Sequence, residues 1–126
     1  MPGAYAHIAI VNDAQKRVDS VSLQKQTALA LGRYLKYVEL GAVGPDYPYL
    51  ALKQAKWADN MHYLNTADVL RTGVAEVRAL SEPERSIATA WFMGIAAHMT
   101  ADMTIHPVVE LKVGPYQANQ GEHRKC

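Results

Sequence analysis

The segment from Ser86 to Val109 is mostly apolar, and its only ionisable side chains are His98, Asp102 and His106. These three residues are spaced four apart, which places them on one face of an α-helix. A helix that is apolar almost all round is typical of the centre of a helical bundle. Burying a charge is costly unless it is paired or bound to a metal, and the segment has no Lys or Arg to pair with Asp102. The segment therefore predicts a buried helix with a specific polar site.

The rest of the chain has the same helical periodicity, so the predicted fold class is all-α: a multi-helix bundle forming one domain over residues 1–126. Two glycines and two prolines within residues 41–50 predict a structured loop, and a polar loop is expected from Gly114 onward. Ser81 and Glu84 have the spacing of a capping box. We expect Pro107 to end the last helix, because proline disfavours helix in the residue before it. The expected helices span residues 4–18, from Ser20 or Ser22 to 41, 53–80 and 83–105, and the expected buried positions of the third are Trp57, Met61, Leu64, Val69, Val74 and Val77.

The composition restricts the classes of partner. Hydrophobic residues make up 49% of the chain and charged residues 20%, which favours a globular rather than a disordered protein. The net charge of +1 does not favour binding to nucleic acid. The single cysteine, Cys126, excludes a thiolate metal cluster within the chain. The N-terminal residues lack a signal-peptide pattern, so we expect a cytoplasmic protein. Residues 86–105 match a membrane span in length, but His98 and Asp102 argue against one, and no transmembrane segment is expected.

Helix geometry limits how the three polar residues of this segment can bind metal. Residues eight apart are separated by about 12 Å along a helix axis, whereas zinc–nitrogen bonds are only about 2.0–2.1 Å long. His98 and His106 are therefore not expected to share an ion. His98 and Asp102 can form one site, and Asp102 has a second oxygen with which to bridge to a neighbouring site. A hydrogen-bonded His–Asp pair without metal is the simpler alternative.

Further candidate ligands lie outside this helix. His7 is near the N-terminus, Asp46 is in the proline-containing loop, His62 is in the third helix, and His123 is in the C-terminal tail. A lone histidine is usually structural or solvated. As a set, these residues fit a metal site inside a helical bundle.

Four motifs, GAVGPDYPY, WADNMHY, GIAAHMTADMTIHP and QGEHRKC, occur in an order that resembles the zinc-dependent phospholipase C family. This family includes bacterial phospholipases C and the N-terminal domain of glycosylphosphatidylinositol-specific phospholipase D. The resemblance implies an all-α fold with up to three zinc ions and hydrolysis of phospholipid phosphodiester bonds. The four-residue step from Asp102 to His106 is closer to the glycosylphosphatidylinositol-specific branch. Since family domains are longer, the chain resembles the N-terminal portion of one.

Carried over by position, the resemblance assigns a ligand set to each ion. Asp102 would bridge the first two ions, and Asp46 would also be catalytic, orienting or deprotonating the attacking water. The implied metal ligands are Asp46, His62, His98 and Asp102 for the first ion, His7 and Asp102 for the second, and His106 and His123 for the third.

The chain departs from the family pattern at two places. Family members supply an N-terminal tryptophan to the second zinc, but no tryptophan precedes His7. They also have a carboxylate four residues after the histidine matched by His123, whereas Glu122 precedes it. The first ion, with four side-chain ligands, is consequently the best-defined prediction.

The expected function is zinc-dependent phosphodiester hydrolysis of a phospholipid, with hydroxide supplied at neutral pH by zinc. The expected partner is a phospholipid, with peripheral contact to a membrane; the sequence indicates no oligomeric state. Two alternatives stay open: a single-strand-specific zinc nuclease, and a non-catalytic helical protein with a partial metal site. The aromatic residues that flank the proposed ligands line either a cleft or the core: Tyr47, Tyr49, Trp57 and Tyr63.

Overall fold

A computed structural model describes residues 3–123, so Cys126 lies outside the described residues. All regular secondary structure in this range is helical, which confirms the predicted all-α class. The elements are α1 (Ala4–Lys16), η1 (Val18–Ser20), α2 (Lys25–Arg33), α3 (Leu35–Val43), η2 (Gly44–Asp46), α4 (Tyr47–Leu50), α5 (Ala55–Asp59), η3 (Asn60–Leu64), α6 (Thr66–Ala79), α7 (Glu84–Val113) and α8 (Gln120–His123).

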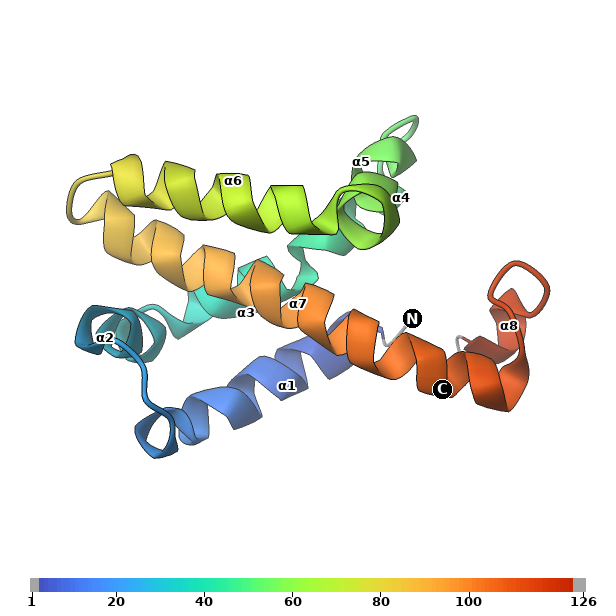
Figure 1. Ribbon diagram of the computed structural model, residues 1–126, viewed down its shortest axis with the longest axis horizontal. Helices are drawn as coiled ribbons and strands as arrows, with labels where there is room; N and C mark the ends of the chain where they lie inside the picture. The colour runs from blue at the N-terminus through green and yellow to red at the C-terminus, as the bar shows by residue number, and fades with distance from the viewer. Residues whose placement is uncertain (1–2, 124–126) are drawn as a thin grey trace.

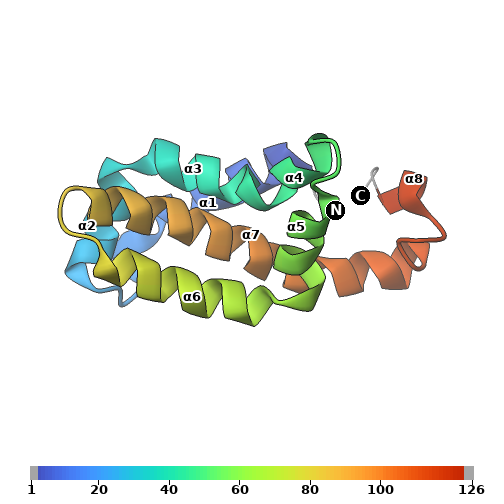
Figure 2. The same ribbon diagram turned by 90° about the horizontal axis from the view of Figure 1, so that it is seen from above.

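The long helix α7 forms the axis of the molecule, as the apolar segment predicted. Figure 1 shows α6 running along one side of α7, with α1, α2 and α3 along the other. Seen from above, α7 lies between α3 and α6, and its C-terminal half extends beyond the other helices to α8 (Figure 2). The N-terminal half of α7 is thus the part around which the bundle packs.

Two apolar clusters lie on opposite sides of α7. On one side, Ala90 packs with Val11 of α1 and Val38 of α3. On the other, Phe92 and Met99 pack with partly buried side chains of η3 and α6. These two clusters fix α1, α3, η3 and α6 around one stretch of α7. The polar residues of α7 follow directly along the chain, so they lie at the end of this core.

Helices α3 and α7 cross in close contact because each has a glycine at the crossing. A Cβ atom added to Gly94 would lie 2.1 Å from the carbonyl oxygen of Val38, and one added to Gly41 would lie 1.9 Å from that of Trp91. Any side chain at either position would force the helices apart. This approach brings the end of α3 against the part of α7 that carries His98.

Two predicted helix ends are wrong. Helix α7 continues through Pro107 to Val113, because a proline inside a helix removes one N–H group and the turns on either side keep theirs. Gly41 does not end the second helix, which instead breaks between Arg33 and Leu35, so that α3 includes Gly41. The predicted loop at 41–50 is largely helical, formed by the end of α3, then η2 and α4.

The predicted third helix is divided into α5, η3 and α6. Its segment Asn60–Leu64 is a π-helix, closed by a hydrogen bond from the Asn65 N–H to the Asn60 carbonyl (2.9 Å). Trp57 and Leu64 were predicted to be buried but are 65% and 70% exposed, because the segment is divided into three elements and a single α-helical period does not run through it. Val74 is also exposed, whereas the remaining predicted positions pack partly buried against the core: Met61, Val69 and Val77.

The predicted capping box before α7 does not form as expected. The Glu82 carboxylate, rather than the Ser81 hydroxyl, accepts hydrogen bonds from the backbone N–H (3.3 Å) and the hydroxyl (2.6 Å) of Ser86.

In the described range, no helix is both long enough and apolar enough to span a membrane.

Candidate metal centre

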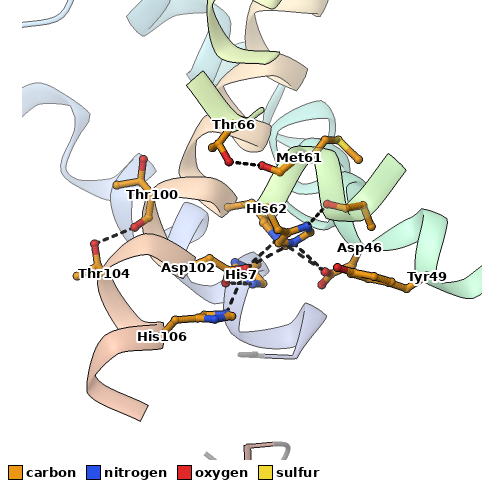
Figure 3. Close-up of polar contacts among 12 residues, drawn as sticks. His7, Asp46, Tyr49, Met61, His62, Thr66, Thr100, Asp102, Thr104 and His106 are labelled. Carbon is orange, nitrogen blue, oxygen red and sulfur yellow. Dashed lines mark hydrogen bonds and ion pairs between the residues drawn. The ribbon is translucent and has the colours of Figure 1, made fainter. Parts of the chain in front are cut away.

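Four segments bring the candidate ligands together at the end of the core. α1 supplies His7, η2 ends in Asp46, and η3 supplies His62, while α7 supplies its predicted residues. Figure 3 shows His7, Asp46, His62, Asp102 and His106 pointing toward one another. Helix spacing accounts only for the α7 residues, and the packing of α1, α3 and η3 on α7 accounts for the rest.

Two backbone carbonyls orient the central imidazoles. Nδ1 of His98 lies 2.7 Å from the carbonyl oxygen of Ala42, and Nδ1 of His62 lies 2.7 Å from that of Ala58. A carbonyl can only accept, so each Nδ1 carries the proton and donates it. In a neutral ring, each Nε2 then presents a lone pair to the centre, which is the form that binds a metal.

These two lone pairs lie unusually close together. Nε2 of His62 and Nε2 of His98 are 2.9 Å apart, although neither has a proton to donate while Nδ1 is the donor. Two facing lone pairs repel unless a cation or an additional proton lies between them. The arrangement therefore fits a cation bound at this position.

Asp102 is the residue to which most of these groups point. Its Oδ1 lies 3.4 Å from Nε2 of His7, and its Oδ2 lies 3.5 Å from the Nε2 atoms of three further imidazoles. Both carboxylate oxygens are buried and accept no hydrogen bond from the described residues. Ligands at about 2.0–2.1 Å from one tetrahedral zinc ion are separated by about 3.3 Å, so the observed distances suit shared zinc better than hydrogen bonding. The three imidazoles around Oδ2 are those of His62, His98 and His106.

Asp46 completes the set from the opposite side. Its Oδ1 lies 3.3 Å from Nε2 of His62 and 3.8 Å from Nε2 of His98, and this atom is also buried without a hydrogen-bond partner. The ligand atoms form two overlapping groups, each with its members within 4.8 Å of one another. The groups are His62, His98 and Asp102, and His7, Asp46 and His98.

The pKa values reflect this crowding. Burial alone raises the pKa of Asp102, but the surrounding imidazoles, His106 most of all, lower it far below its usual range. Burial alone lowers the pKa of His62, but the Asp46 carboxylate and the Ala58 carbonyl together raise it above the usual value. Asp102 is consequently an ionised, buried carboxylate, which is the state a bridging metal ligand requires.

The structure brings together the residues predicted for the first two ions but not both residues predicted for the third. The four residues predicted for the first ion do converge, and His7 faces the other oxygen of Asp102, as bridging requires. His106 also faces Asp102. In contrast, His123 donates through Nε2 to the Gly114 carbonyl (2.6 Å) and packs against Tyr116, and no contact joins it to His106 among residues 3–123. The assignment of a third ion to His106 and His123 stays a prediction.

A cleft of about 700 Å³ opens beside these ligands, with Asp46 and His106 in its wall. Tyr49 and Tyr63 also line it, so they are cleft residues rather than the core aromatics that the alternative interpretation expected. The Tyr49 hydroxyl donates to Asp59 Oδ1 (3.0 Å), and the pKa of Tyr49 is raised by burial and by this carboxylate. Tyr47 and Trp57 do not line the cleft, and both are exposed.

Sequence reasoning missed several cleft residues. Glu110 lies four residues after His106, and the periodicity that located Asp102 would have found it if the helix had not been ended at Pro107. Tyr116 has no comparable signal, because it lies in a turn whose position depends on how α8 packs on α7.

Comparison with known proteins identifies a family. The sequence model of the family described as zinc dependent phospholipase C matches residues 6–126, which is nearly the whole chain. No curated protein and no solved structure matches significantly. The match agrees with the resemblance carried by the four motifs, and the buried donor set suits zinc. The chain belongs to the zinc-dependent phospholipase C family.

Proposed function

We propose that the protein hydrolyses a phosphodiester bond of a phospholipid with the help of zinc. The observation that carries this proposal is Asp102, whose two unpartnered oxygens lie 3.4–3.5 Å from four imidazole nitrogens. Family membership supports the general activity, since the family is that of zinc-dependent phospholipases C. Zinc, when bound, lowers the pKa of a coordinated water molecule and stabilises negative charge on phosphoryl oxygens.

The residues of the chain would divide the work between holding the metal and handling the substrate. His62, His98 and Asp102 would hold the first ion, with both imidazoles oriented by backbone carbonyls. Asp46 would complete that site and orient the attacking water, since its side chain lies at the boundary between the donor set and the cleft. As a carboxylate in the cleft wall, it can also accept a proton from this water.

The cleft itself would bind the phosphodiester. Its aromatic walls, Tyr49 and Tyr63, offer apolar faces and hydroxyl groups. The described residues that line it include no Lys or Arg, so the negative charge of the phosphate would be balanced by the metal ions. The same lack of cationic residues gives no support to the nuclease alternative, because a polyanion requires a positively charged groove.

The test of this proposal combines metal analysis with turnover. The zinc-loaded protein should hydrolyse a chromogenic phosphodiester and phosphatidylcholine, and it should lose activity on chelation and regain it with zinc. Turnover of phosphatidylcholine should greatly exceed that of single-stranded DNA. Protein that holds zinc but turns over neither substrate would instead be the non-catalytic metal protein.

An Asp46→Asn variant tests the role of that carboxylate. Because removing a general base typically costs a factor of 10²–10⁴, we expect kcat to fall by about that factor. Zinc content, measured alongside, separates loss of the base from loss of the ion. Asp68→Asn is the matched control, since Asp68 is on the surface, where Arg71 is its only ion-pair partner among residues 3–123. A kcat that is unchanged in Asp46→Asn would contradict the proposed role.

A further inference from the structure

The turn that joins α4 to α5 exposes large apolar side chains beside the cleft. We call residues 50–57 the rim loop: they comprise the last residue of α4, the connecting residues and the start of α5. Leu50, Leu52 and Trp57 in this loop are 84%, 94% and 65% exposed. Figure 1 shows the loop projecting away from the helix bundle at the α4–α5 end. Single exposed apolar residues are ordinary, but a cluster on one projecting loop marks an interaction surface.

The rim loop is also positively charged. Its only charged side chains are Lys53 and Lys56, both exposed, and no ion pair involves either of them in the described range of the chain. Lys53 has a φ of 64°, in the left-handed region that non-glycine residues rarely adopt, and it turns the chain at the tip of the loop. Apolar and aromatic side chains interleaved with lysines are the composition of segments that insert at the surface of an anionic bilayer.

The position of the rim loop connects it to the candidate metal centre. Leu50 lines the cleft together with the neighbouring Tyr49, and Asp46 lies one helical turn before them. A surface that covered the rim loop would therefore also face the mouth of the cleft.

We propose that the rim loop docks on the surface of a phospholipid bilayer that contains anionic lipids, and so presents the mouth of the cleft to the headgroups. This proposal rests on the proposed function, because docking would deliver the phospholipid substrate of that reaction to the cleft. Leu52 and Trp57 enter the boundary between headgroups and acyl chains, while Lys53 and Lys56 contact lipid phosphates.

A second copy of the chain fits this surface less well. In a two-fold symmetric dimer, the same patch of each subunit faces the other, so the two lysines of one loop would face the lysines of its partner. The described part of the loop has no acidic residue to relieve this repulsion. Positive charge instead complements an anionic lipid surface.

Vesicle flotation tests the proposal with the zinc-loaded full chain. The protein should float with vesicles of phosphatidylcholine and phosphatidylglycerol, and less with vesicles of phosphatidylcholine alone. We expect Leu52→Ser and the double variant Lys53→Glu/Lys56→Glu each to lower the partition coefficient by about tenfold or more. Only the second variant should remove the dependence on phosphatidylglycerol. Thermal unfolding verifies that each variant is folded.

Matched controls come from the opposite end of the molecule. Leu29 is 62% exposed on α2, and Lys25 is an exposed lysine at the start of the same helix. Leu29→Ser and Lys25→Glu repeat the two chemical changes away from the rim loop, and we expect neither to alter flotation. In a Trp91→Phe background, Trp57 becomes the only tryptophan, and its fluorescence should shift to the blue when vesicles are added.

The results separate docking from catalysis because flotation requires no turnover, and a soluble chromogenic phosphodiester requires no membrane. Wild-type protein that hydrolyses the soluble substrate but does not float with either kind of vesicle would overturn docking alone. Rim-loop variants that float like the wild type would also overturn it. So would sedimentation that shows a dimer broken by Leu52→Ser.

Discussion

Asp102 is the residue on which the candidate metal centre depends most. Its two oxygens face four imidazoles, from α1, η3 and two further turns of α7, whereas the other candidate carboxylate, Asp46, faces two. Without a cation, four imidazole nitrogens and two unpartnered carboxylate oxygens would share one buried space. In the proposed site, Asp102 would place negative charge between zinc ions that would otherwise repel each other.

An Asp102→Asn substitution should remove this role while keeping the shape of the side chain. An amide presents only one oxygen acceptor and no charge, so we expect zinc affinity to fall by at least about 100-fold and the bound zinc per chain to decrease. Elemental analysis after dialysis and titration calorimetry measure both quantities. Asp68→Asn is the control, and zinc content equal to the wild type in Asp102→Asn would contradict the proposed bridging.

Lowering the pH should weaken zinc binding, starting above the ordinary histidine pKa. The pKa of His62 is raised in the metal-free protein, so its Nε2 retains a proton at a higher pH than an ordinary imidazole. Zinc requires the neutral ring, so this proton must leave, and affinity should fall by about tenfold per pH unit for each proton displaced. Calorimetry in buffers of different protonation enthalpy counts the released protons. Zinc affinity that does not change between about pH 8 and pH 6 would contradict this expectation.

At the scale of the helix pair, the crossing of α3 and α7 sets the geometry of the site. The Ala42 carbonyl that orients His98 belongs to α3, and it reaches the ring only because Gly41 and Gly94 let the two backbones approach. On the other side of the site, the π-helical turn η3 positions His62. A hydrogen bond from the Thr66 hydroxyl to the Met61 carbonyl (2.7 Å) lies at the end of this turn.

A Gly94→Ala substitution should therefore damage both stability and metal binding. The added Cβ would lie 2.1 Å from the Val38 carbonyl oxygen and 2.7 Å from the Ala42 backbone nitrogen, both of which are rigid. We expect the free energy of unfolding to fall by about 3 kcal/mol and zinc affinity to decrease, because Ala42 must shift away from His98. Chemical denaturation and calorimetry measure these effects.

Gly32→Ala is the matched control for that variant. No atom lies within 4 Å of a Cβ added at Gly32 in α2. This substitution should raise the free energy of unfolding by about 0.5–1 kcal/mol, since alanine loses less backbone freedom in a helix than glycine. If the two substitutions changed the free energy of unfolding equally, the close crossing of α3 and α7 would not be what excludes a side chain at Gly94.

The helix elements were only partly predictable from the sequence. The face shared by His98 and Asp102 follows from four-residue spacing, which any α-helix imposes. The prediction that the helix ends at Pro107 was wrong. Proline removes one backbone hydrogen bond, but the helical turns before and after Pro107 keep theirs, and the helix continues to Val113. The π-helix of η3 could not be predicted, because its extra residue depends on how α5 and α6 pack.

At the scale of the whole molecule, the candidate metal centre joins segments that bury few side chains of their own. Helix α1 buries only His7 and Val11, and η2 and η3 are short. Zinc bound to His7, Asp46 and His62 would connect all three to α7. The ions would thus act as part of the core at the end of the molecule where apolar packing is sparse.

Zinc should consequently stabilise the folded protein. A ligand that binds only the folded state at 100 times its dissociation constant adds about 2.7 kcal/mol to the free energy of unfolding. We expect chelation to lower Tm by several degrees and to decrease hydrogen-exchange protection in α1, because His7 anchors that helix. Differential scanning calorimetry and exchange mass spectrometry provide the measurements. Protection of α1 that is the same with and without zinc would contradict this role.

The sequence by itself determined the helical class, the central apolar helix and the spacing of its ligands. These features are local, because backbone geometry alone puts residues four apart on one face. The tertiary structure decided which distant residues join them. His7 and His62 reach Asp102, and Asp46 reaches His62 and His98, because glycines allow α3 to approach α7 and because η3 adopts a π-helical turn. It also decided that Leu52 and Trp57 are exposed beside the cleft, since burial depends on what packs against a segment and not on its own hydrophobicity.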